Sequence, residues 1–382
     1  MERRTAIKML GAIGAAGLPG GLRAAPEPEA QKVDVLVVGG GTAGVVAALQ
    51  AARAGARTQL VEMGGQLGGT MTVGGVNWPA LFNAWGKPVI AGIGWELVTR
   101  AVELDGGKFP DLSVPNEVHG GHAVGVNGQL YAAVAEEACL EIGVVLRYYE
   151  FPLSVRAADD GWQVDLAGKG VRRQIHCRQL IDCTGGADIV GMIGLPRLRD
   201  AETQPGTLIF SLTGYSTGAL DAKAIETRYR EALRDGRLQE GDYCYAGRPF
   251  LDFLKRGGAN QQHIFGADGS TSETKTAANI AGRASVLRLL RFVRSLPGCS
   301  GAKLAKMQTE TAVRETFRIV GETMVTQADF TAGRVYEDAV GFTFYPIDIH
   351  DRHGVEPQKL KPGIVPTLPL REIGRASCRE SV

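Results

Sequence analysis

The stretch that decides the fold is Val33-Asp34-Val35-Leu36-Val37-Val38-Gly39-Gly40-Gly41-Thr42-Ala43-Gly44. Its first half is an apolar, mostly β-branched run of the length typical of a buried parallel strand. The second half has the spacing Gly-x-Gly-x-x-Gly. Gly39 permits a tight turn, Gly41 lets the backbone approach a pyrophosphate, and Gly44 lets the next helix pack closely on the strand. The pattern predicts a nucleotide-binding turn.

A helix is expected directly after this turn. The sequence from Thr42 to about Arg53 is rich in alanine and valine, and Gly55 ends it. The backbone amides of the first helical turn, at Thr42, Ala43 and Gly44, would face the phosphates together with the positive end of the helix dipole.

A second apolar strand, predicted at Thr58 to Val61, ends in Glu62, which lies eighteen residues beyond Gly44. A carboxylate at this place can accept hydrogen bonds from ribose hydroxyls and would repel a 2′-phosphate. Strand, turn, helix, strand and acid therefore predict a βαβ unit for FAD or NAD. The alternative is a glycine-rich turn in an unrelated α/β protein.

A second glycine-rich segment, Gly64 to Val76, follows the acid at once. An NAD domain would normally continue into a helix here. The segment instead resembles the flavin-contacting loop of the FAD-dependent oxidoreductase family, in the glutathione-reductase-like superfamily. The resemblance implies FAD as the cofactor, with Gly68, Gly69 and Thr70 beside it.

The resemblance covers most of residues 33–371. Gln179 to Asp188 is similar to the family's later strand and turn, with Thr184 and Gly185 beside the cofactor, although any strand ending in a turn would fit these residues equally well. Residues 313–322 and 344–350 resemble segments on the substrate side of the flavin. Phe151, after a strand predicted at 144–149, is expected to contact adenine through its backbone.

These features predict an α/β fold, in which a Rossmann-type parallel sheet binds FAD and an inserted β-rich and helical domain lies on the substrate side. The strand at 144–149 and the alternating residues 161–166 would join the sheet to a hairpin layer over it. A basic helix is expected from Ala281 to Ser295. We expect the segments to divide as a signal peptide at 1–30, the FAD-binding domain at 31–190, the inserted domain at 191–310, and a return to the FAD-binding domain at 311–371, with 372–382 outside the fold.

For catalysis we prefer His350 as the acid or base, the alternative being a solvated loop histidine. Arg314 and Arg318 are four residues apart on a presumed helix, so they would share a face and could hold a substrate carboxylate. A salt-bridged helix surface involving Glu315 and Glu322 is the competing interpretation. Where the family usually has a second arginine, this chain has Phe317, so a paired-arginine clamp is in doubt.

Other classes of function are disfavoured by composition and motifs. The chain has 382 residues, is 44% hydrophobic and has a formal net charge of +1, which argues for a globular protein and against nucleic-acid binding. His119-Gly120-Gly121-His122 lacks carboxylate or cysteine partners, so we expect no metal. No CxxC pair and no second Gly-x-Gly-x-x-Gly are present, which argues against a disulfide reductase.

The predicted function is that of an FAD-dependent dehydrogenase, oxidase or reductase acting on a small organic substrate. The alternatives are an NAD-dependent dehydrogenase and a non-catalytic nucleotide-binding protein.

The first residues resemble a twin-arginine export signal. Arg3 and Arg4 precede a weakly apolar run from Met9 to Leu18, which is too short for a stable membrane span of about 20 residues. A frayed basic tail is the alternative. The interpretation predicts export through the twin-arginine machinery to the periplasm.

The last residues, Glu372 to Val382, agree with translated sequencing adapter at ten of eleven positions, so we expect the natural sequence to break off near Arg371. A genuine polar tail is the alternative. The family's closing strand, glycine turn and helix would then be missing, so the sequence is compatible with an active and with an inactive truncated chain.

Replacing both Arg3 and Arg4 by lysine should abolish export, because the export receptor reads the arginine pair and not the charge alone. Fractionation of cells that express the double variant should find the protein in the cytoplasm. Normal recovery from the periplasm would contradict the interpretation.

Overall fold

The computed structural model describes residues 29–80, 82–84, 87–88, 90–114, 122–218, 220–244, 247–343, 345–350, 360–361 and 363–373. The twin-arginine-like segment, His119 and the adapter-like residues from Gly374 onward lie outside these ranges.

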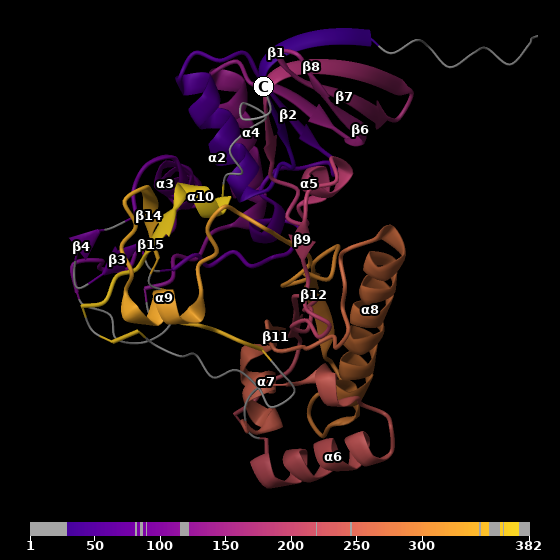
Figure 1. Ribbon diagram of the computed structural model, residues 1–382. Helices are drawn as coiled ribbons and strands as arrows, with labels where there is room; N and C mark the ends of the chain where they lie inside the picture. Colours follow the sequence, from indigo (N-terminus) through magenta and orange to yellow (C-terminus); the bar gives the residue numbers. More distant parts are fainter. Residues whose placement is uncertain are drawn as a thin grey trace, which may run out of the picture.

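A six-stranded sheet organises the upper part of the molecule (Figure 1). Four strands run parallel in the order β5-β2-β1-β8, and β7 and β6 continue the sheet in antiparallel pairing. The strands are β1 (Glu29–Val38), β2 (Thr58–Glu62), β5 (Val145–Tyr148), β6 (Glu150–Ala158), β7 (Gly161–Gly168) and β8 (Val171–Asp182). The predicted Rossmann-type parallel sheet is confirmed.

The sheet is buried on both faces where β1 and β2 are apolar at consecutive positions, at Val35 to Val38 and at Leu60 and Val61. Val35, Val37 and Leu60 pack under α2 (Thr42–Arg53), α3 (Ile93–Leu104) and α4 (Gly128–Glu141). The alternate side chains Leu36, Val38 and Val61 pack against the β6–β7 hairpin and α5 (Asp188–Met192). Burying a side chain of this size stabilises the fold by roughly 1.5–3 kcal/mol. The hairpin covers the second face of the sheet, as the sequence predicted, and it also continues the sheet in antiparallel pairing, which was not predicted.

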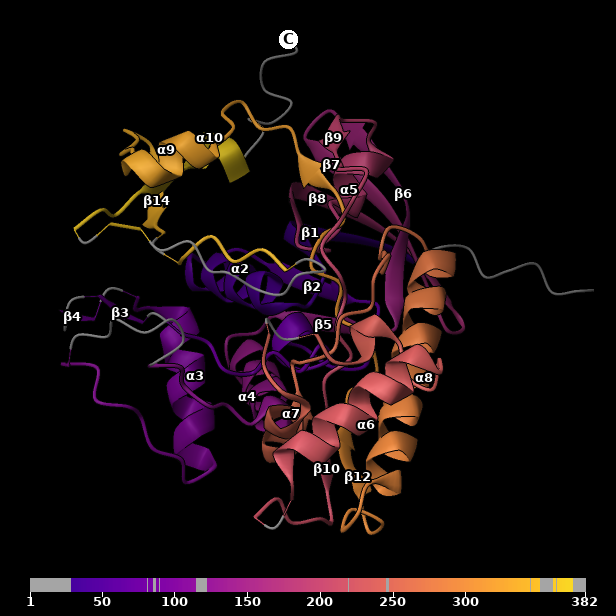
Figure 2. The same cartoon turned by 90° about the horizontal axis from the view of Figure 1, so that it is seen from below.

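A second body with its own core lies below the sheet in Figure 1 and to its lower right in Figure 2. Buried aromatic side chains make up much of this core, namely Phe210, Tyr243, Phe250, Phe253 and Phe292. The body consists of β10 (Phe210–Thr213) between β11 (Gly258–Ala259) and β12 (Lys303–Met307), with η2 (Glu240–Asp242), α6 (Ala222–Arg234), α7 (Phe250–Arg256) and α8 (Ser272–Ser295).

Helix α8 begins earlier than the predicted basic helix from Ala281. Thr271 and Thr274 form a capping box that starts the helix at Ser272. The first turns, Ser272 to Thr276, are polar and show no apolar periodicity, so the hydrophobic pattern revealed only the part that packs on the core.

The chain returns from this body through residues 311–319, where β13 (Arg318–Ile319) pairs with β9 (Arg197–Leu198). A further group then lies apart from α6, α7 and α8 in Figures 1 and 2. It comprises α9 (Gln327–Ala332), β14 (Ala339–Phe342), β15 (Thr367–Pro369) and α10 (Leu370–Ile373). The short pieces η1 (Gly69–Met71), β3 (Asn83–Ala84) and β4 (Lys87–Pro88) complete the described elements. Among the described residues, no helix has both the length and the apolar character needed to cross a membrane.

Replacing Gly44 by alanine should destabilise the protein by about 2 kcal/mol or more, because the new Cβ would overlap the carbonyl oxygen of Gly39. Gly94→Ala in α3 is the matched control. Its Cβ meets open space, and alanine favours a helix, so this change should be neutral or stabilising. Urea unfolding of both variants measures the difference, and equal midpoints would contradict the packing described for Gly44.

Candidate functional site

The candidate site begins at the carboxyl ends of β1 and β8, which lie side by side in the sheet. Gly39 turns the chain with φ +101°, and a Cβ there would overlap the carbonyl oxygen of Cys183. A Cβ on Gly44 would overlap Gly39 and approach the Cys183 side chain at 3.2 Å. Both glycines are therefore required for the close packing of turn, helix and β8, as their spacing predicted.

The amino terminus of α2 is open toward this edge of the sheet. Gly41 is the N-cap residue, and no side chain in the described structure caps the helix there. The first turn also contains no acidic side chain. The amides of Thr42, Ala43 and Gly44 therefore present an uncompensated positive end, which is the arrangement that binds a phosphate.

The second glycine-rich segment packs directly on this helix end. The Gly68 amide donates to the Gly40 carbonyl oxygen at 2.8 Å, and Gly41 and Gly68 form a parallel bridge. A Cβ on Gly69 would lie 2.9 Å from the Gly41 Cα, so only glycine fits. Gly69 to Met71 then form the single 3-10 turn η1, with Thr70 exposed. The two glycine-rich loops, which are separate in sequence, form one surface.

Glu62 joins the two loops at their base. Its Oε2 accepts from the Gly40 amide at 2.7 Å, and its Oε1 accepts from the Gly64 amide at 2.6 Å. Each carboxylate oxygen can accept more than one hydrogen bond, so contact with ribose hydroxyls remains compatible with these bonds. The role of Glu62 as a link between the loops was not visible in the sequence pattern.

Tyr149 is a site residue that sequence reasoning missed. It has φ +59°, its amide donates to the Gly64 carbonyl oxygen at 3.2 Å, and its hydroxyl lies against Gly65. The ring thus lies over the start of the second glycine-rich loop. Phe151 lies two residues later on β6 with 46% of its surface exposed, and its predicted adenine contact stays a prediction. A residue that follows a strand carries no sequence signal for such a backbone conformation.

The turn after β8 is held rigid by Asp182. Its Oδ1 accepts from the amide and hydroxyl of Thr184 at 3.0 and 2.7 Å, and its Oδ2 accepts from the Val190 amide at 3.1 Å. The carbonyl of Gly185 accepts from the Thr316 hydroxyl at 3.1 Å. The predicted cofactor residues Thr184 and Gly185 therefore lie beside the β1–α2 turn and are tied to the segment that returns from the lower body.

The prediction that Arg314 and Arg318 share a helix face is wrong. The chain is irregular up to Arg318, which begins strand β13 and forms an exposed ion pair with Asp200 at 2.8 Å. Neither Glu315 nor Glu322 forms the expected helix-surface pair with it. The sequence Val313 to Glu322 has polar and apolar residues at helix-like spacing, but pairing with β9 draws Arg318 into a strand.

Arg314 is largely buried and serves as a tie within the protein. Its guanidinium donates to the Pro205 carbonyl oxygen, to Thr207 Oγ1 at 3.1 Å and to Asn260 Oδ1 at 3.3 Å. Burial lowers the pKa of Arg314 to about 10, although the charges of Asp348 and Glu315 oppose this shift. The paired-arginine clamp is therefore not formed, and Phe317 stacks instead under the guanidinium of Arg197, 3.9 Å from its ring centre.

His350, the predicted acid or base, lies in a cluster of polar side chains and not on an open loop. Its Nδ1 is 3.0 Å from Nε2 of His263, and its Nε2 is 3.8 Å from Asp348 Oδ1. Its amide donates to Gln204 Oε1 at 2.8 Å. His263, which is 2% exposed, was missed because it lies 87 residues away in an unremarkable stretch.

A short chain of contacts connects this cluster to the second glycine-rich loop. Gly74 approaches Ala312 so closely that an added Cβ would lie 3.4 Å from its side chain. Ala312 exchanges two backbone hydrogen bonds with Thr207, each of 2.9 Å. The Thr207 hydroxyl donates to the carbonyl of Gln262, the neighbour of His263, at 2.8 Å. The histidine cluster is therefore attached to the wall that the loop contacts.

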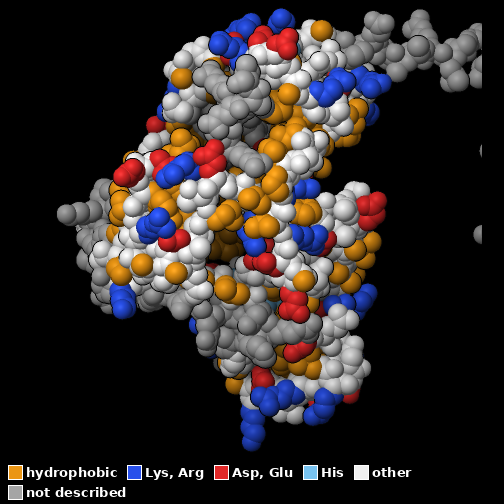
Figure 3. Space-filling model, in the orientation of Figure 1, with side chains coloured by type: hydrophobic (Ala, Val, Ile, Leu, Met, Phe, Trp, Pro, Cys, Tyr) orange, Lys and Arg blue, Asp and Glu red, His pale blue; other side chains and the backbone are white. Residues whose placement is uncertain are grey.

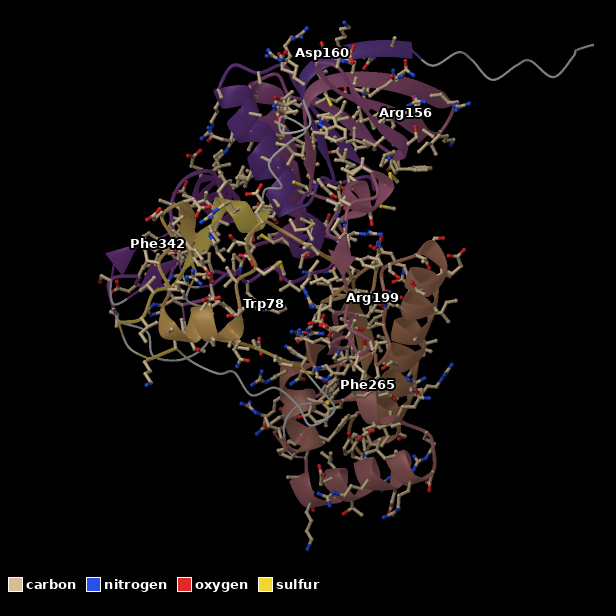
Figure 4. The ribbon with its side chains drawn as sticks, viewed as in Figure 1. Trp78, Arg156, Asp160, Arg199, Phe265 and Phe342 are labelled. Atoms are coloured by element: carbon tan, nitrogen blue, oxygen red, sulfur yellow. The ribbon has the colours of Figure 1, made fainter. Side chains whose placement is uncertain are left out.

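The surface is hollowed between the sheet and the lower body, and hydrophobic and charged side chains border the hollow (Figure 3). Trp78, two residues beyond the second glycine-rich loop and 37% exposed, lies between these two parts of the molecule in Figure 4. Phe265, close to His263, lies lower in the same view. An aromatic side chain beside the hollow, such as Trp78, offers a flat apolar surface to a substrate.

Across the described ranges, no group of three or more His, Cys, Asp or Glu side chains is arranged to hold a metal ion. His122 instead approaches the Asn83 side chain at 3.2 Å through Nδ1.

Comparison with known proteins supplies a family match. A family model described as FAD dependent oxidoreductase matches residues 34–376. A search of curated proteins finds no match. Similar solved structures include the OxyS anhydrotetracycline hydroxylase from Streptomyces rimosus, with 16% identity and a TM-score of 0.41 over 77% of this chain and 55% of that chain.

Two further solved structures show a similar degree of likeness. A geranylgeranyl bacteriochlorophyll reductase-like protein from Thermoplasma acidophilum has 17% identity and a TM-score of 0.38 over 73% of this chain and 65% of that chain. A flavoprotein/dehydrogenase from Cytophaga hutchinsonii has 22% identity and a TM-score of 0.34 over 48% of this chain and 46% of that chain. The chain thus spans between 46% and 65% of the length of these three structures.

Glu62→Arg should weaken FAD binding at least tenfold, because it removes both amide contacts between the loops and places a cation near their donors. Glu62→Gln is the matched control. This variant keeps one acceptor oxygen and the shape of the side chain, so its loss of FAD affinity should be smaller than that of Glu62→Arg. Quenching of flavin fluorescence on titration measures both affinities, and equal affinity of Glu62→Arg and the parent chain would sink the assignment.

Proposed function

The chain belongs to the FAD-dependent oxidoreductase family, and from this we propose that it binds FAD over its two joined glycine-rich loops and oxidises or reduces a small organic substrate. The observation that carries the proposal is the contact of Gly41 with Gly69 beside the open amino terminus of α2. The strand β1, its glycine-rich turn and α2 would by themselves suit several nucleotide cofactors, NAD included. The second loop provides a further backbone surface beyond the phosphates, which a flavin needs.

The residues present fit the group. The α2 amides of Thr42 to Gly44 would hold the pyrophosphate, since no side chain of the described structure caps that helix end. Glu62 lies at the end of β2, where ribose hydroxyls are bound in this type of fold. Gly68, Gly69 and Thr70 would lie along the flavin. Thr184 and Gly185 would contact FAD from the opposite side.

Residues 64–76 argue against the alternative of an NAD-dependent dehydrogenase. They form turns and the short η1 and do not continue into a helix after Glu62. The loop also contacts the lower body through Gly74 and Gly75, the latter lying against the Gln308 side chain. A loop held between both bodies is suited to placing a cofactor ring against a substrate.

Bound FAD supplies the capacity to accept or donate a hydride, and the chain supplies the proton transfer and the orientation. His350 is the residue that we propose to hold the proton, at Nε2, the nitrogen not directed at His263. Asp348, 3.8 Å from this atom, would stabilise the imidazolium that forms when a substrate proton is taken up. Gln204 and Arg314 would keep the surrounding backbone in place.

The cellular location is a separate proposal. The paired arginines near the amino terminus support export by the twin-arginine route. Such export suits a flavoprotein because that route carries proteins already folded around their cofactors.

His350→Asn should lower the rate at which substrates bleach the flavin by about tenfold or more, since loss of a general acid or base costs about 10²–10⁴ in rate. Anaerobic mixing with small alcohols, amines, 2-hydroxy acids and reduced nicotinamides identifies a donor and measures the rate. His176→Asn is the control, because His176 pairs with Asp160 at 2.7 Å, and Asp160 lies at the end of the sheet that is remote from the lower body (Figure 4).

FAD content should be the same in both variants and in the parent chain. An unchanged bleaching rate in His350→Asn would rule out His350, and a parent chain whose flavin no donor bleaches would contradict the proposed activity.

A further inference from the structure

Two histidines from distant parts of the chain face each other through their ring nitrogens. His263 Nε2 and His350 Nδ1 are 3.0 Å apart, and the rings meet at 64° with centres 5.1 Å apart. His263 is 2% exposed, and the side chain of His350 is 11% exposed. The contact therefore lies almost wholly out of water.

Each imidazole is held independently of the other. The His263 amide donates to the Gly241 carbonyl oxygen at 2.8 Å, and Phe265 packs edge-on 6.1 Å from the His263 ring. The backbone amide of His350 donates to the side-chain oxygen of Gln204. Gln204 in turn donates to the Glu315 carboxylate, from its backbone amide at 2.9 Å and from its side-chain Nε2 at 2.7 Å. The contact is thus fixed from both sides and does not depend on one mobile residue.

A hydrogen bond between two imidazole nitrogens requires one proton between them. If His350 carries it on Nδ1, His263 Nε2 is the acceptor, and His350 Nε2 keeps a lone pair in the neutral state. If His263 carries it, neutral His350 has its proton on Nε2 and cannot accept there. The tautomer of His263 therefore decides whether His350 can act as a base toward a substrate.

The nearby charges favour one extra proton on the pair and oppose two. Asp348 lies 3.8 Å from His350 Nε2, on the side away from His263. Among the described residues, Arg314, whose charge Asp348 attracts, and Glu315, which holds Gln204, lie near the contact on the His350 side. On the His263 side, Asp242 follows Gly241 and is paired with Arg288 at 2.7 Å. Two imidazolium rings at 3.0 Å would repel each other in a buried place, so a second extra proton is excluded.

We propose that His263 and His350 work as one proton-holding pair, in which His263 is the positioning residue that keeps the lone pair of His350 on Nε2. In the proposed oxidation the substrate hydride would go to bound FAD, and the O–H or N–H bond of the substrate breaks as its proton forms a bond to His350 Nε2. The proton on His350 Nδ1 can then pass to His263 Nε2, which leaves the positive charge on His263. One proton enters the pair and none is lost. This inference rests on the proposed function of His350 and adds the partner that makes it a base.

The pair can be tested without turnover. In the parent chain with histidine labelled in ¹⁵N, NMR should show scalar coupling across the His263–His350 hydrogen bond and protonated Nδ1 on His350. His263→Gln offers an amide oxygen as acceptor near the position of Nε2 and should keep this tautomer. His263→Phe keeps the ring shape without the acceptor and should move the proton of His350 to Nε2.

The turnover number kcat should stay high in the variant that keeps the Nδ1 tautomer of His350 and fall in the variant that loses it. His263→Gln should keep kcat within a few-fold of the parent, whereas His263→Phe should lose about tenfold or more in kcat with KM little changed. If His263→Phe does not fold, the coupling in the parent chain decides alone. Absence of coupling, or an unchanged His350 tautomer in His263→Phe, would overturn the pair. A changed tautomer with unchanged kcat would overturn its role in proton transfer.

These readouts separate the inference from the proposed function. A chain that fails to bleach with any donor contradicts the proposed activity, while its NMR spectrum still shows whether the pair exists.

Discussion

The site depends on the contact between two stretches of backbone, at Gly41 and Gly69, which a side chain on Gly69 would block. A Cβ on Gly69 would lie 2.9 Å from the Gly41 Cα, so the second loop can touch the first only with glycine at position 69. The Gly68–Gly40 hydrogen bond and the two amides bound by Glu62 fix this contact. The open end of α2 and the second loop thereby become one binding surface for FAD.

The substrate side is attached to this surface by polar contacts and not by a large shared core. The sheet and the lower body have separate hydrophobic clusters. The Thr207–Ala312 bridge and the Arg314 hydrogen bonds fasten the returning segment to the lower body. The bond from Thr316 to Gly185 and the contacts of Gly74 with Ala312 and of Gly75 with Gln308 join it to the sheet side. Because these bonds are directional, they set the position of the histidine pair relative to the second loop more sharply than apolar packing would.

Local steric rules explain which parts of the fold could be predicted from the sequence. The strand at 33–38, the helix from Thr42 to Arg53 and the strand ending at Glu62 follow from apolar runs and glycine spacing, and the structure confirms them. The presumed helix around Arg314 and Arg318 is wrong, because pairing with β9, over a hundred residues earlier, outweighs local periodicity. The contact of His263 with His350 likewise depends on tertiary structure, which no local pattern reveals. Tyr149 was missed because its positive φ is imposed by its neighbours.

Equilibrium binding of FAD to the nucleotide-free chain, measured with and without excess NAD⁺, tests the central claim most directly. The account predicts one FAD per chain, a shifted visible flavin spectrum, and no displacement by NAD⁺, because only FAD uses both glycine-rich loops. Displacement of FAD by NAD⁺ at comparable concentration, or saturable NAD⁺ binding with no uptake of FAD, would contradict it.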